Sequence, residues 1–168
     1  MAFSSAELKI LCASISTSCQ EMIVGITNFK NNLQNRPAFI RPFVKRDFEN
    51  GTGLEPEEWI EFLKRLFSRF TTILTTLNSI ESGRGSKEDL REAALPFLER
   101  HELIIDTFKR FEDYMRSLPK RATSIPREFA NEEDKRMMTE EAPKVAERLS
   151  QFIAAINKAS FQLREITQ

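Results

Sequence analysis

His101 is the only histidine of the 168-residue chain and the residue with the clearest capacity for chemistry. An imidazole titrates near neutral pH, so it could act as a general base or as a pH-sensitive switch. His101 falls on the apolar line of a predicted helix, where a polar group is costly unless it is hydrogen-bonded. We therefore expect a neutral imidazole bonded to a backbone carbonyl that Pro96 leaves unpaired, or to a Ser or Thr of a neighbouring helix. A catalytic base or a pH switch is the alternative.

The sequence predicts no metal, haem or nucleotide site. A carboxylate-bridged di-iron bundle needs a Glu-x-x-His motif on each of two helices, which one histidine cannot supply. A globin-like haem site needs a single histidine, but globin helices cross at steep angles and do not keep matched seven-residue patterns. The glycines at 51 and 53 and at 83 and 85 lack the preceding strand that phosphate-binding loops need. We therefore expect no cofactor.

Two cysteines, Cys12 and Cys19, are seven residues apart on one predicted helix. This spacing puts their Cα atoms about 10 Å apart along the helix axis, whereas a disulfide needs less than about 7 Å. Both lie on an apolar line far in sequence from His101, so neither is a convincing nucleophile. We expect buried free thiols in a reducing compartment.

Basic and aromatic residues are mixed in residues 36–48. Such a mixture can bind single-stranded RNA or an anionic membrane surface. The interpretation we favour is an amphipathic connector whose Phe side chains pack inward while its basic groups are solvated. The residues concerned are Arg36, Phe39, Arg41, Phe43, Lys45, Arg46 and Phe48.

A second basic segment, residues 116–127, contains Lys120 and Arg121 and no acidic residue. The sequence Lys-Arg-Ala-Thr, ending at Thr123, has the basic-basic-x-Thr form that basophilic kinases accept. A phosphate on Thr123 would reverse much of the local charge. Thr123 is therefore a candidate phosphorylation site, although a solvated loop is the ordinary fate of such a segment.

Four long stretches carry apolar residues at alternating steps of four and three, the pattern of helices that pack side by side at shallow angles. They cover residues 5–32, 56–81, 87–118 and a last stretch that ends at residue 166. The last helix should begin between Asn131 and Thr139, and Thr139 with Pro143 in the first turn is one candidate start. Pro96 should bend the third helix, because proline leaves a carbonyl near Glu92 without its helical partner. The short turn between the second and third helices makes these two antiparallel.

The predicted fold is therefore an all-α, antiparallel four-helix bundle with up-down-up-down order, forming a single domain over residues 1–168. The connection at residues 31–53 should contain a short extra helix of about two turns from Pro42. We expect this segment to lie across the bundle with its Phe side chains plugged into an open edge.

Composition narrows the classes of function. Twenty-five basic and twenty-five acidic residues give no net charge, so nucleic acid is an unlikely partner. Glu7 and Lys9 interrupt the N-terminal apolar run, which therefore fails as a signal peptide. The sequence has no run of 18 uncharged apolar residues, so we expect neither secretion nor a membrane span. The cytoplasm is the expected location, with the nucleus as the alternative.

The leading functional hypothesis is a non-enzymatic interaction bundle, an adaptor, a scaffold or a self-associating protein. The second helix carries two apolar rows, one more than a single seam needs, so one row remains for a partner protein bound in a helix-in-groove mode. The expected contacts are Phe39, Phe43, Ile60, Phe67 and Leu74.

Two other classes of function remain open. One is peripheral binding to an anionic membrane through basic loops, which predicts a steep dependence on salt. The basic patch for this binding is Arg41, Lys45, Arg46, Lys120 and Arg121. The other class is an enzyme that uses His101 as its base.

Overall fold

The computed structural model describes residues 5–126 and 130–168, and these residues form helices and short connections without a strand. The all-α prediction is therefore confirmed. Arg127, the last residue of the predicted basic segment, lies outside the described residues. The elements are α1 (Ser5–Leu33), α2 (Arg41–Thr52), α3 (Pro56–Glu81), α4 (Lys87–Glu99), α5 (His101–Ala122), α6 (Glu132–Arg136), the π-helical turn η1 (Met137–Glu141) and α7 (Ala142–Thr167).

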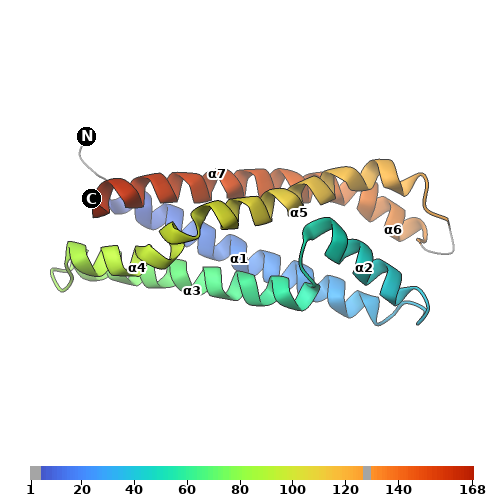
Figure 1. Cartoon of the computed structure of the whole chain (residues 1–168), viewed down its shortest axis with the longest axis horizontal. Helices are drawn as coiled ribbons and strands as arrows, with labels where there is room; N and C mark the ends of the chain where they lie inside the picture. Colours follow the sequence, from blue (N-terminus) through green and yellow to red (C-terminus); the bar gives the residue numbers. More distant parts are fainter. Residues whose placement is uncertain (1–4, 127–129) are drawn as a thin grey trace.

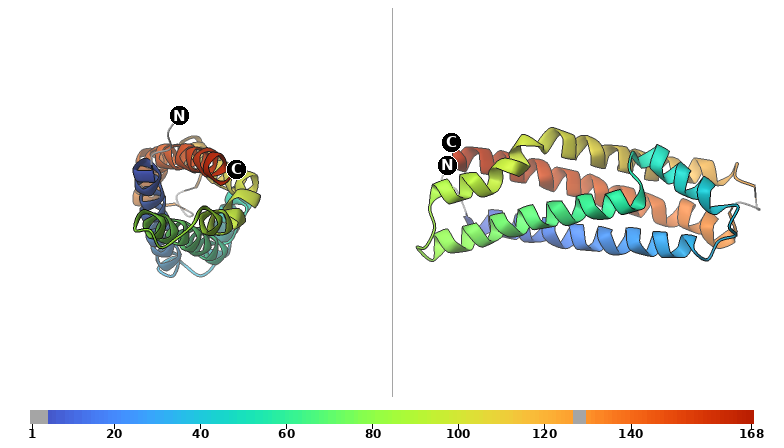
Figure 2. Two further views of the ribbon diagram at one scale, coloured as in Figure 1. Left: turned by 90° about the vertical axis from the view of Figure 1, so that its left-hand side faces the viewer. Right: turned by 60° about the horizontal axis from the view of Figure 1, so that its bottom comes forward.

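The long helices run side by side and make an elongated molecule (Figures 1 and 2). α1 packs along α3, and α5 packs along α7. α4 contacts both α3 and α7. The start of α1 and the end of α7 lie at one end of the molecule, and the connection from α1 to α2 lies at the other (Figure 1).

The inward-facing rows predicted from the seven-residue patterns are the rows that the structure buries. Burying these side chains removes apolar surface from water, which is the main favourable term in folding. The fully or nearly fully buried members include Leu8, Cys12, Ile15, Cys19, Trp59, Leu63, Phe70, Ile73, Phe97, Phe108, Ile156 and Leu163.

α1 is the helix, among the described residues, whose length and composition would suit a membrane span. Its most apolar window has a mean hydropathy of 1.3. Core helices share this composition, and 28% of this window is buried inside the structure. The buried side chains of α1 include Leu8, Cys12, Ile15, Cys19 and Ile26.

The predicted single helix at 87–118 is two helices. α4 continues through Pro96 and ends at Glu99, and α5 begins at His101 after Arg100, which has φ −108° and ψ 8°. The break thus comes about one turn after Pro96 and about two turns after Glu92, whose carbonyl proline was expected to leave unpaired. Arg164 of α7 donates a hydrogen bond of 2.9 Å to the carbonyl of Leu98, which satisfies a group at the end of α4.

The break changes the neighbours of this part of the chain. α4 lies against α3, whereas α5 lies along α7, and α2 fits beside α5 and the start of α3 (Figure 1). Large rings span the space between α3 and α5: the Trp59 ring centroid lies 5.6 Å from that of Phe108 and 4.8 Å from that of Phe111. The expected helix in the first connection therefore exists, and it packs against α5 and α3.

α2 is longer than the two turns expected from the sequence. It continues through Asn50 and Gly51 and ends before Gly53. Gly53 has φ +92°, a left-handed conformation that glycine adopts without the steric cost of a Cβ atom. The chain can therefore turn sharply from α2 into α3.

The last helical segment starts where Asn131 caps α6: its side-chain oxygen accepts a hydrogen bond of 2.9 Å from the backbone N–H of Asp134. One π-helical turn, η1, then leads into α7, with Pro143 in the first turn as predicted. The expected start between residues 131 and 139 is thus at the beginning of that interval.

Candidate functional site

His101 is half-buried at the first position of α5, and its Nε2 lies 2.8 Å from Oδ1 of Asn157 on α7. Its ring meets that of Phe97 edge-on at a centroid distance of 6.0 Å. The expected hydrogen bond to a neighbouring helix therefore exists, but the partner is an amide rather than a hydroxyl or a freed carbonyl. An amide orients the imidazole and does not titrate, so this pair joins α5 to α7 without forming a proton relay.

Cys12 and Cys19 are free and buried, as predicted. Burial disfavours the thiolate and raises the pKa of each thiol to about 12. A nucleophilic cysteine needs the opposite shift, toward a lower pKa. Both thiols therefore behave as apolar core groups.

The five predicted partner-binding residues divide into two groups. Phe39 and Phe43 are 65% and 58% exposed, although the favoured interpretation had them pack inward. That interpretation is wrong for these two residues. Ile60, Phe67 and Leu74 are half-buried and pack against the core, spread over about 21 Å of α3.

The C-terminal half of α2 is anchored to the core by Phe48. Its ring centroid lies 4.9 Å from that of Phe29 on α1, 5.9 Å from Phe111 and 6.0 Å from Tyr114 on α5. This residue does plug the opening between helices, as the sequence suggested for the whole segment. Contacts with two long helices hold this half of α2 in a single position.

A buried hydrogen-bond chain fixes the end of α2. Nε1 of Trp59 donates to Oγ1 of Thr52 over 2.8 Å. The same hydroxyl donates to the carbonyl of Phe48, also over 2.8 Å. Arg110 of α5 donates to the carbonyl of Asn50 over 2.7 Å. Polar groups are thus satisfied where α2, α3 and α5 meet, as burial requires.

Asp47 links the middle of α2 to α5. It accepts a hydrogen bond of 2.9 Å from the hydroxyl of Tyr114 and a charged hydrogen bond from Arg121. Burial, reinforced by the charge of Asp47, raises the pKa of Tyr114. The hydrogen bond to Asp47 also raises the pKa of Arg121. Arg121, predicted as part of a basic patch, is therefore engaged within the molecule.

The other predicted basic residues differ in whether they form hydrogen bonds within the protein or are exposed. Arg41 donates to the carbonyls of Arg36 and Gln34 over 2.9 and 2.8 Å, which caps the end of α1. Arg46 is exposed on α2, and Lys120 is exposed on α5. Thr123, the candidate phosphorylation site, is exposed just after α5, and its hydroxyl donates to the carbonyl of Lys120 over 2.9 Å.

A basic pocket of about 290 Å³ lies between the end of α1 and the starts of α2 and α3. Three of its lining residues, Lys30, Arg41 and Lys45, are cationic, and one, Glu57, is anionic. Lys30 Nζ lies 3.5 Å from Glu57 Oε1. A backbone hydrogen bond, helped by the charges of Lys45 and Lys30, lowers the pKa of Glu57. The pocket therefore keeps an excess of positive charge.

A second, open pocket of about 360 Å³ lies between α3 and α4. Arg65, Arg69, Glu92 and Pro96 are among its lining residues. Arg65 donates to the carbonyl of Glu61 in its own helix over 3.4 Å. These side chains are arranged as on an ordinary charged helix surface and give the pocket no specific chemistry.

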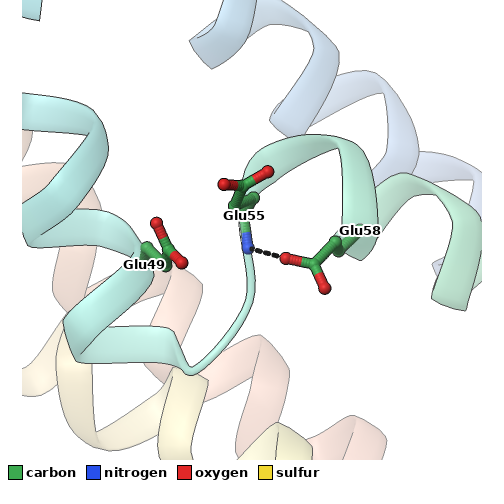
Figure 3. Close-up of side chains that lie close together, drawn as sticks. All are labelled: Glu49, Glu55 and Glu58. Atoms are coloured by element: carbon green, nitrogen blue, oxygen red, sulfur yellow. Dashed lines mark hydrogen bonds between the residues drawn. The ribbon is translucent and has the colours of Figure 1, made fainter. Parts of the chain in front are cut away.

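Three carboxylates that the sequence analysis did not group, Glu49, Glu55 and Glu58, come together where α2 leads into α3 (Figure 3). One oxygen from each lies within 4.8 Å of the others. Divalent cations prefer such ligands, but Glu58 accepts a hydrogen bond of 3.1 Å from the backbone N–H of Glu55 as half of a capping box. The start of α3 accounts for two of the three carboxylates, and we assign no metal to them.

Comparison of the chain with protein-family models, with curated proteins and with solved structures found no match. The feature that stands apart is the segment at residues 36–46, which we call the α2 corner. It exposes two aromatic rings, and it begins a helix whose other half is fixed in the core.

Proposed function

We propose that the protein is a non-enzymatic docking module: a helical scaffold that presents the α2 corner to another cellular component. The observation that carries this proposal is the exposure of Phe39 and Phe43 on a segment that is held in place. Exposed aromatic rings are favourable contacts for a partner because each buries a large area at a low cost in side-chain entropy.

The scaffold in this proposal is a four-helix bundle in which α4 and α5 count as one bent helix. The pairing of α1 with α3 and of α5 with α7 supports this interpretation, as does the contact of α4 with both pairs. α2 is then the extra helix of the first connection. Its anchoring through Phe48 and Thr52 means that the corner is presented by a rigid body.

The apolar strip on α3 has no docking role in this proposal. Ile60, Phe67 and Leu74 pack against the core, so their burial is explained within the chain. The docking contacts are therefore limited to Phe39, Phe43 and the basic groups around them. The hydrogen bond between His101 and Asn157 and the raised pKa values of the two cysteines support a non-enzymatic role.

Capture from native extract tests this proposal with a matched pair of variants. Phe39→Ser/Phe43→Ser removes the two rings of the corner. Ile10→Ser/Val24→Ser removes two side chains of α1 that are 71% and 58% exposed, so it controls for the general loss of surface apolarity. Protein and lipid retained by each immobilised chain would be identified by mass spectrometry.

The proposal predicts that a stoichiometric component is retained by the unmodified chain and by the α1 variant, and is lost from the corner variant. Retention of the same component by both variants would show that the corner is not the docking surface.

A further inference from the structure

We propose that the α2 corner docks on an anionic phospholipid bilayer, with Phe39 and Phe43 inserted at the interface and phosphate groups held by the basic side chains around them. This inference rests on the proposed function and names the partner of the same surface. Four observations support it. They are the local charge, the division of the basic side chains into those that form ion pairs within the protein and those that do not, the helix face on which the rings lie, and the size of the apolar contact.

The local charge is strongly positive in a chain that has no net charge. Residues 22–46 contain no Asp or Glu, and they contain five basic residues. Basic clusters beside exposed aromatic side chains are typical of segments that lie in the interface of an anionic membrane. These five residues are Lys30, Arg36, Arg41, Lys45 and Arg46.

The structure separates these five cations into engaged and available groups. Arg36 forms an ion pair with Asp134, and Lys30 lies beside Glu57. Arg41 donates to two neutral carbonyls, and these contacts do not cancel its charge. Lys45 lines the basic pocket, and Arg46 is exposed. The available cations, Arg41, Lys45 and Arg46, therefore lie close in sequence to Phe43.

Phe39, Phe43 and Arg46 share one face of the segment. They lie at i, i+4 and i+7, and Ile40 already has helical angles, φ −86° and ψ −34°. Phe48, about 140° from Phe43 around the helix axis, is buried in the core. One face of α2 thus holds the protein core, and the other presents two rings and a cation, which is the amphipathic arrangement of an interfacial helix.

The size of the apolar contact favours a bilayer over a partner protein. Two phenylalanine side chains bury at most about 300–500 Å², whereas a stable protein interface buries about 800 Å² on each partner. A bilayer needs only a few apolar anchors when electrostatic attraction adds to them. The corner also lies at one end of an elongated molecule, where a flat surface can reach it (Figure 1).

Acidic side chains limit the direction of approach. Glu132 and Glu133 are exposed at the start of α6, next in sequence to the Asp134 that pairs with Arg36. An anionic surface would repel these carboxylates. The docked molecule therefore contacts the bilayer with the α2 side of this end and keeps α6 away from it.

Flotation of the full chain with lipid vesicles tests the proposal. Vesicles of phosphatidylcholine alone would be compared with vesicles that also contain phosphatidylserine, at low and at physiological ionic strength. Flotation with the anionic vesicles should exceed that with neutral vesicles and should weaken as salt rises, because salt screens the attraction.

Two test variants, each with a matched control, have expected effects on the partition coefficient between water and anionic vesicles. Phe39→Ser/Phe43→Ser should lower the partition coefficient at least tenfold (roughly, from the apolar area withdrawn), whereas Ile10→Ser/Val24→Ser should leave it unchanged. Lys45→Gln/Arg46→Gln should lower it about 25-fold, about fivefold for each charge. Arg148→Gln/Lys158→Gln, which alters two exposed charges of α7, is the matched control.

Equal flotation with neutral and anionic vesicles, no flotation at all, or loss that is the same in test and control variants would each overturn the membrane proposal. If vesicles fail but a protein from native extract is lost only from the corner variant, the docking function stands and its partner is a protein. If neither assay depends on the corner, both proposals fail. Circular dichroism and thermal unfolding would establish that each variant is folded.

Discussion

The two halves of α2 each carry one phenylalanine, yet the two rings are held in opposite ways. Phe48, in the second half, is buried among rings of α1 and α5, and Thr52 is hydrogen-bonded to Trp59. Phe43, in the first half, is largely exposed, as is Phe39 just before the helix. The difference follows from helical geometry, because Phe43 and Phe48 point about 140° apart whereas Phe39 and Phe43 point about 40° apart.

In the proposed function, the second half of α2 therefore serves stability, and the first half serves docking. The second half of α2 contributes apolar burial and buried hydrogen bonds, so substitutions there should change the free energy of unfolding. Phe39 and Phe43 are largely exposed, so removing their rings should change binding far more than stability. The variants below test that separation, beginning with the largest expected effect.

Phe48→Ala should lower the free energy of unfolding by about 3–5 kcal/mol, because it removes a buried ring and leaves a cavity between three helices. Urea denaturation followed by circular dichroism would measure the change. Phe43→Ala is the control in the same helix, and its expected effect is below about 0.5 kcal/mol. Similar losses for the two variants would contradict the division of α2 into an anchored and a presented half.

Thr52→Val should cost about 1–3 kcal/mol, because the indole N–H of Trp59 would keep its burial and lose its acceptor. Trp59 is the only tryptophan of the chain, so its fluorescence reports directly on this contact. Thr72→Val, at an exposed position of α3, should be nearly neutral. An unchanged emission spectrum together with unchanged stability would rule out a role for Thr52 in fixing α2.

Tyr114→Phe should cost about 1 kcal/mol through the loss of one hydrogen bond to Asp47. Tyr114 is the only tyrosine, so its ionisation can be followed by absorbance. Because its pKa is raised in the folded chain, its contribution to stability is present below the pKa of unfolded tyrosine and is lost as pH rises toward the folded value. Asp47→Asn should move the titration to lower pH, and an unshifted titration would contradict the proposed link.

Phe39→Ser/Phe43→Ser should have the smallest effect on folding, within about 0.5 kcal/mol for each exposed side chain. Thermal unfolding would measure it beside the flotation assay. A large loss of stability would mean that the rings belong to the packed structure and not to a docking surface.

The sequence predicted the long helices well because their periodic apolar rows are the rows that become buried. The rows of α1, α3 and α7 depend only on helical spacing, which a single sequence displays directly. The same logic would have placed Phe48 on a different face of α2 from Phe39 and Phe43, because the five residues from Phe43 to Phe48 turn the helix by about 140°. Treating all the Phe residues of this segment as one inward set concealed that difference.

Other features depend on the tertiary structure and had weaker signals. The break at Arg100 needed knowledge of Arg164, which comes from α7 and satisfies a carbonyl of α4. The partner of His101, Asn157, is 56 residues away in sequence. Asp47 is the first acidic residue after residues 22–46, which contain no Asp or Glu. That position in the sequence could have indicated that Asp47 forms an ion pair within the protein. The grouping of three glutamates required the turn between α2 and α3 to be known.

Hydrogen exchange of the full chain, alone and with phosphatidylserine vesicles, tests the central claim most directly. The account predicts that amides of residues 47–52 exchange slowly in both samples, like those of α3 and α5, and that vesicles add protection within residues 37–46 alone. It would be contradicted if residues 47–52 exchanged as fast as the corner, or if the bound protein gained its protection elsewhere, such as along the outer face of α1.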